Sequence, residues 1–131
     1  VAVVVVVVAG CRCSRRGTTP LVVVAVEQEQ LEELDITNNQ FSGYIPNELG
    51  ELTYLKSVNL SFNYFTGEIP SQLLQIEGLE LLYLHVNELS GTISDDFCID
   101  DKAMKILIYG NSFCPPYPEC IKYIGKQTCE N

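Results

Sequence analysis

The chain has 131 residues, a formal net charge of −9 and a pI near 4.4. This length suits one modest domain with a real core, and 47% hydrophobic with 19% charged residues excludes wholesale disorder. So acidic a chain is a poor nucleic-acid binder, and one His with no Trp leaves few groups for acid–base chemistry near neutral pH.

Residues 1–26 form a valine-rich arm that differs from the rest of the chain. The arm carries a charge of +3, whereas residues 27–131 carry −12. Its two β-branched runs, Val1–Ala9 and Leu21–Val26, flank a segment rich in Gly, Cys and Arg, and they predict short strands. Neither run is long enough to span a membrane as a helix.

The start of the arm also resembles a processing signal. Val1–Ala9 has the length of the apolar region of a signal peptide, and Val8-Ala9-Gly10-Cys11 is similar to a bacterial lipobox. That resemblance implies a lipid anchor at Cys11. No basic residue precedes the valines, which weighs against a leader. The alternative is a donor strand for assembly, to which we assign Val4, Val6, Arg12, Arg15 and Arg16.

Residues 27–111 repeat with a period of 24 residues. Aliphatic residues recur three and five positions before an asparagine, and Phe or Leu recurs two positions after it. Gly and then Ile follow in the first three copies. These columns indicate about four stacked coils that share one core. The period is marked by four asparagines: Asn39, Asn63, Asn87 and Asn111.

The pattern L-x-x-L-x-L-x-x-N-x-F-x-G-x-I-P is that of a leucine-rich repeat, and it resembles the 24-residue subtype common in plant extracellular receptors. The resemblance covers about residues 31–131. It implies an α/β-type solenoid with a short parallel β-sheet on the concave face and an irregular or 3-10 convex side. Leu-x-Leu itself predicts a short strand with both leucines inward. The asparagine side chains are expected to bond backbone groups of adjacent turns as a ladder.

Residues 112–131 predict a cysteine-rich C-terminal cap over the end of the solenoid. The segment C-P-P-Y-P-E-C-I is similar to the endings of secreted leucine-rich-repeat proteins from environmental bacteria. Cysteines near this end indicate disulfides and an extracellular or cell-surface protein. Three pairings are possible, and we favour Cys98–Cys120 and Cys114–Cys129 because Cys98 lies almost one repeat before Cys120. No C-x-x-C knuckle is present in the cap, so no metal site or cofactor is expected.

The outward side chains of the predicted strands are expected to form a binding surface. The first coil offers acidic and polar groups, and the last two offer an apolar cluster typical of an interface anchor. Cover by the arm or cap is the alternative. We expect His85 to be a solvated surface side chain, and Asn59-Leu60-Ser61 is a glycosylation candidate at Asn59. The predicted anchor consists of Leu81, Tyr83, His85, Val86, Leu107 and Tyr109.

No enzyme signature is present in the sequence, so we expect no catalysis. The first hypothesis is a self-assembling surface or filament subunit, whose arm adds as a strand to the open edge at Leu34–Ile36 of another copy. The second is a ligand-recognition domain (adhesin, receptor ectodomain or enzyme inhibitor) that binds another extracellular protein or a glycan through the concave face. Neither hypothesis involves nucleic acid or a transmembrane span.

Overall fold

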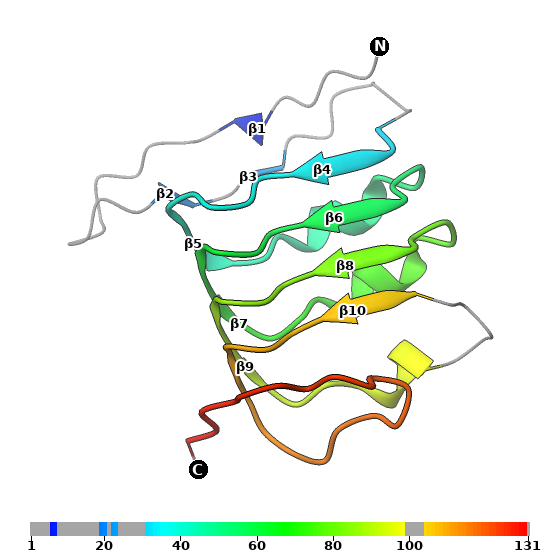
Figure 1. The fold of residues 1–131 in the computed structure, drawn as a ribbon. Helices are drawn as coiled ribbons and strands as arrows, with labels where there is room; N and C mark the ends of the chain where they lie inside the picture. Colours follow the sequence, from blue (N-terminus) through cyan, green and yellow to red (C-terminus); the bar gives the residue numbers. More distant parts are fainter. Residues whose placement is uncertain (1–5, 8–18, 21, 24–30, 99–103, 131) are drawn as a thin grey trace.

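The computed structural model describes residues 6–7, 19–20, 22–23, 31–98 and 104–130 (Figure 1). Four short strands stack side by side in parallel. Each residue in them pairs with the residue 24 positions further along, so that Leu34 lies opposite Val58 and Leu82 opposite Ile106. This sheet forms the concave face of a solenoid. Its strands are β4 (Glu33–Asp35), β6 (Ser57–Asn59), β8 (Leu81–Tyr83) and β10 (Lys105–Leu107).

A second parallel sheet and a set of three 3-10 helices, one helix to a coil, complete the solenoid. The 3-10 segments were expected, but the sequence analysis did not anticipate the sheet. The helices are η1 (Asn47–Glu51), η2 (Ser71–Gln75) and η3 (Asp95–Cys98). The sheet contains, in spatial order, β2 (Thr19–Pro20), β5 (Phe41–Tyr44), β7 (Tyr64–Gly67), β9 (Glu88–Gly91) and β11 (Ser112–Phe113).

The described parts of the arm pair within the same chain. β1 (Val6–Val7) is antiparallel to β3 (Val22–Val23), and β2 is parallel to β5 with Thr19 opposite Phe41. Among the described arm residues, β2 extends the second sheet and none pairs with the edge at Leu34–Ile36, to which the sequence analysis assigned the arm of another copy. Val6 lies in β1. The other residues assigned to assembly or anchoring lie outside the described residues: Val4, Cys11, Arg12, Arg15 and Arg16.

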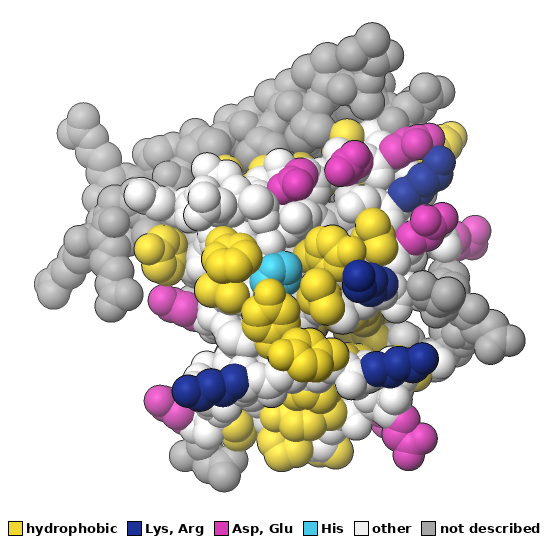
Figure 2. All heavy atoms as spheres, in the orientation of Figure 1, with side chains coloured by type: hydrophobic (Ala, Val, Ile, Leu, Met, Phe, Trp, Pro, Cys, Tyr) yellow, Lys and Arg dark blue, Asp and Glu magenta, His cyan; other side chains and the backbone are white. Residues whose placement is uncertain are grey.

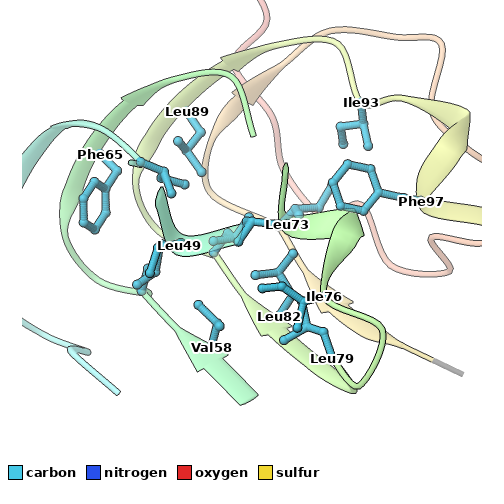
Figure 3. Packing of buried hydrophobic residues seen from close by; sticks show 14 of the residues in the cluster. Leu49, Val58, Phe65, Leu73, Ile76, Leu79, Leu82, Leu89, Ile93 and Phe97 are labelled. Carbon is cyan, nitrogen blue, oxygen red and sulfur yellow. The ribbon is translucent and has the colours of Figure 1, made fainter. Parts of the chain in front are cut away.

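The core lies between the concave strands and the 3-10 helices (Figure 3). Val58 and Leu82 point inward from β6 and β8, where they meet Leu49 and Leu73 from η1 and η2, and all four side chains are fully buried. Inward placement of the Leu-x-Leu positions is thus confirmed. Ile106, the same position in β10, is only half-buried because no further coil stacks on it.

Three of the four ladder asparagines tie backbone groups of two neighbouring coils, as predicted: Asn63, Asn87 and Asn111. Asn63, which is 6% exposed, donates from Nδ2 to the carbonyl oxygens of Leu60 (3.1 Å) and of Ile36 in the preceding coil (3.0 Å). Its Oδ1 accepts the N–H of the first residue of β5 at 3.0 Å. Asn87 and Asn111 repeat the arrangement. The Asn oxygen thereby positions the first residues of the second sheet.

The cap continues this ladder with a glutamine. Gln127 Nε2 donates to the carbonyl oxygens of Ile108 and Ile124, both at 2.9 Å, and its Oε1 accepts the N–H of Phe113 at 3.1 Å. Gln127 also forms a parallel bridge with Asn111. It follows Asn111 by 16 residues and not 24, so the repeat period could not reveal it.

Two disulfides fix the cap, with the pairing that the spacing favoured. Cys98–Cys120 joins the end of η3 to the cap (Cα–Cα 5.5 Å), and Cys114–Cys129 closes the cap on itself (4.9 Å). Cys114 N–H also donates to the carbonyl of Gly91 in β9. The cap is therefore tied to both the helical and the sheet sides of the last full coil.

Removing one ladder amide should destabilise the fold strongly. Asn63→Ala leaves the N–H of Phe41 without its acceptor and removes one of the two amide donors from the carbonyls of Ile36 and Leu60, which costs about 1–3 kcal/mol in free energy of unfolding. Asn39→Ala is the matched control, because Asn39 is exposed and, among the described residues, its amide donates within its own coil. Urea unfolding should show a clearly smaller loss for Asn39→Ala. Equal losses would contradict the ladder's role in joining coils.

Reduction of the cap disulfides should lower the melting temperature and promote aggregation. Each cross-link contributes about 2–4 kcal/mol, and a frayed cap exposes the apolar end of the last coil at Ile106 and Ile108. Calorimetry with and without a thiol reductant measures the effect. A variant with all four cap cysteines replaced by Ser should melt lower and ignore the reductant. An unchanged wild-type transition after complete reduction contradicts the prediction.

Candidate interaction surface

The structure brings the six residues of the predicted anchor together on the concave face. Tyr83 and Leu107 are directly paired across β8 and β10, and the N–H of Val86 donates to the carbonyl of Tyr109. Four of the six are half-buried: Leu81, Tyr83, Leu107 and Tyr109. Neighbouring coils therefore present these side chains as one patch.

Aromatic rings form a continuous row across this patch. His85 stacks on Tyr109 with ring centroids 4.6 Å apart, and it meets Phe62 edge-on at 5.3 Å and Tyr83 at 6.2 Å. Tyr109 in turn contacts Tyr123 of the cap at 5.8 Å. We call Phe62, Tyr83, His85, Tyr109 and Tyr123 the ring row. It links three coils and the cap through contacts that favour edge-on or offset rings.

The expectation of a solvated His85 is wrong, because its side chain is only 9% exposed and lies between the surrounding rings. Its Nδ1 is buried with no hydrogen-bond partner. Desolvation by these rings lowers the pKa of His85 below its ordinary value of 6.5. The imidazole is therefore held neutral in the folded protein near pH 7.

Two anchor-face residues have a left-handed backbone conformation. Phe62 and Val86 both have φ of +55°, at positions that Asn38 and Gly110 occupy in the first and last coils. Asn and Gly adopt this conformation readily, whereas it is unusual for an aromatic or β-branched residue. Nevertheless Phe62 is 47% exposed and Val86 is 36% exposed. Burial in the core therefore does not explain why bulky apolar residues stand there.

Charge is distributed unevenly around the ring row (Figure 2). Acidic side chains gather along β4, where Glu33 and Asp35 are exposed, and lysine side chains flank the half of the face nearer the cap. Lys56 is neutralised by an ion pair with Glu32 at 3.0 Å. Lys105 Nζ lies 5.7 Å from the centroid of the Tyr83 ring, within range of a cation–π contact.

The first two coils carry a polar network on the same face. Ser61 Oγ and Thr37 Oγ1 are 2.7 Å apart, and both lie within bonding distance of Asn59 Oδ1. His85 occupies the next position of this column but does not continue the network. The Asn59 amide is half-buried and held by its oxygen, and its glycosylation stays a prediction.

Sequence reasoning missed two members of the ring row, Phe62 and Tyr123. Phe62 belongs to a set of repeat positions whose side chains were expected to point outward. A large aromatic residue at a position that favours Asn or Gly could have indicated its role. Tyr123 lies outside the repeat, so no periodicity could place it beside Tyr109.

The described residues contain no group of three or more His, Cys, Asp or Glu side chains that could hold a metal ion. In the same ranges of the chain, no helix is long and apolar enough to cross a membrane. The concave face therefore offers aromatic rings and charged side chains for non-covalent contacts.

Comparison with known proteins agrees with this architecture. The family profile for Leucine Rich Repeat matches residues 30–52 and 54–76. The BIR2 ectodomain from Arabidopsis thaliana is 34% identical over 66% of this chain, with a TM-score of 0.61. The ectodomain of the plant receptor kinase GASSHO1/SCHENGEN3 from the same species, in complex with CASPARIAN STRIP INTEGRITY FACTOR 2, is 36% identical over 66%, with a TM-score of 0.60. The chain therefore has a leucine-rich-repeat solenoid fold.

A third similar structure is the plant peptide hormone receptor RGFR1 in complex with RGF2, at 26% identity over 83% of this chain and a TM-score of 0.64. The chain spans 46% of the BIR2 ectodomain, 10% of GASSHO1/SCHENGEN3 and 18% of RGFR1. Among curated protein sequences none matches this chain significantly.

Acidification should destabilise the ring row through His85. The folded-state pKa lies below the unfolded value, so the stabilisation is present above pH 6.5 and is lost as pH falls through the folded-state pKa. His85→Phe removes the titration but keeps a ring, and His85 is the only histidine. The melting temperature of the wild type should therefore fall relative to that of His85→Phe between about pH 7 and about pH 5. A constant difference contradicts the assignment.

Proposed function

We propose that this chain is a non-catalytic extracellular recognition domain that binds a protein or peptide partner through the ring row and anchor on its concave face. The observation that carries the proposal is the left-handed backbone at Phe62 and Val86. Such a conformation costs of order 1 kcal/mol or more for a residue that does not favour it. Partner contact accounts for bulky, exposed side chains where the equivalent coils use Asn and Gly.

The surroundings of these residues support an interface. The ring row ranges from the buried His85 to the exposed Phe62 and Tyr123, and a cluster of aromatic side chains framed by charge is typical of residues that carry most of the binding energy. Similar solved structures include a receptor bound to a peptide hormone and an ectodomain bound to CASPARIAN STRIP INTEGRITY FACTOR 2. Extracellular localisation is supported by the two disulfides.

Recognition is favoured over self-assembly. Within the described residues the arm strands already have partners in the same chain, since β1 pairs with β3 and β2 with β5. No observation in this part of the chain supports a filament contact. A partner other than a second copy therefore accounts better for the exposed anchor.

A display library of random peptides tests the proposal. Peptides selected on the wild type should bind Val86→Asp at least about tenfold more weakly, because the charge enters an apolar contact. Asp tolerates the left-handed conformation, so the variant should fold.

Tyr44→Asp is the matched control, because Tyr44 is 76% exposed and lies in β5 of the second sheet. The selected peptides should bind Tyr44→Asp as tightly as they bind the wild type, as measured by surface plasmon resonance. Full retention by Val86→Asp, or an equal loss in both variants, contradicts the proposed surface.

A further inference from the structure

An apolar pocket of about 430 Å³ opens between β10 and the cap. Its inner wall consists of Phe97, Met104, Ile106 and Ile121. This volume and lining are in the range of sites that hold a small ligand or a few side chains. The pocket adjoins the ring row, since Tyr123 belongs to both.

The pocket lies along residues 120–128 of the cap, where the disulfide and the backbone ties to the last coil lie at the two ends of the segment. At one end Cys120 is bonded to Cys98. At the other, the carbonyl of Lys126 accepts the N–H of Gly110 and Thr128 N–H donates to Asn111. Between these ties, no backbone hydrogen bond joins residues 120–123 to β10 in the described part of the chain. The disulfide and the backbone bonds therefore lie on either side of the gap.

One wall of the pocket is the unpaired edge of a β-sheet. β10 pairs with β8 on one side and is the terminal strand of its sheet among the described residues. In parallel pairing Leu107 directs its backbone groups toward β8, where its carbonyl accepts the N–H of Leu84, so those of Ile106 face the gap. A free strand edge favours a peptide main chain over a lipid or a sugar.

The described lining of the pocket is basic, in an acidic protein. Lys105 and Lys122 line it, and both are exposed. None of the described lining residues is acidic, although the chain carries a net charge of −9. Lys105 Nζ lies toward the Tyr83 ring, so the exposed Lys122 supplies the ammonium group beside the apolar lining, and this pairing fits a carboxylate attached to an apolar group.

We propose that this pocket binds the C-terminal residue of a partner peptide. Its apolar side chain fills the space lined by Phe97, Met104 and Ile106, and its main chain pairs with the edge of β10. Its terminal carboxylate lies beside Lys122. An internal peptide segment lacks that carboxylate, so the pocket selects a chain end. The site goes beyond the concave-face anchor and would continue it toward the cap.

Fluorescein-labelled hexapeptide pools, randomised except at the last residue, test the assignment by fluorescence polarisation on the full chain. Pools that end in Leu with a free carboxylate should bind at least about tenfold more tightly than the same pools with a C-terminal amide. Pools that end in Asp should bind as weakly as the amides. Equal binding by the acid and amide pools overturns the proposal.

Lys122→Gln should remove most of the preference for the free carboxylate. Lys126→Gln is the matched control, because Lys126 is an exposed cap lysine outside the pocket lining. Equal effects of the two variants overturn the proposal, as does displacement of the Leu pool by octanoate at an affinity equal to that of the pool. Displayed peptides that lack a free C-terminus test only the concave-face anchor, so the two proposals can fail separately.

Discussion

The amide ladder is the constraint on which the rest of this structure depends. A coil of 24 residues has too little apolar surface to fold alone, so each coil needs backbone bonds and packing from its neighbours. One side-chain amide supplies both a donor pair and an acceptor, and Asn63 uses all of them at distances of 3.0–3.1 Å. Because that amide occupies the same place in every coil, the strands that precede it align in one parallel sheet and the strands that follow it align in another.

The same constraint explains where the protein carries its unusual residues. The residue before each ladder asparagine turns the chain from the first sheet into the second, with φ between +55° and +68°. The ladder stabilises this turn whatever its side chain, so Phe62 and Val86 remain tolerated there at a cost in stability. The ring row thus rests on backbone that the ladder has already fixed. A rigid base of this kind reduces the entropy lost when a partner binds.

Much of the fold followed from the sequence because it is periodic. The columns of inward aliphatic residues, the ladder asparagines and the cap disulfides all depend on spacing along the chain, and spacing is visible in one sequence. The second sheet was missed although Phe65 and Thr66 favour strands, because Ser42 and Gly43 do not and the ladder asparagines of the next coil help to extend these segments. The burial of His85 was missed because it depends on Phe62 and Tyr109 from the adjacent coils. Gln127 and Tyr123 lie outside the period altogether.

The cap continues the hydrogen bonds of the amide ladder but, among the described residues, adds no strand beside β10. The end of the solenoid is therefore closed at the ladder and open at the concave sheet. Gln127 has one more methylene than Asn, so it reaches the carbonyl of Ile108 from a chain that does not follow the course of a coil. That course brings the cap against residues 110–111 but leaves it apart from β10. A cap that packed against β10 as well as against residues 110–111 would have buried Ile106 and the edge of β10. Because the amide alone is enough to terminate the ladder, the apolar end of the concave sheet stays open beside the ring row.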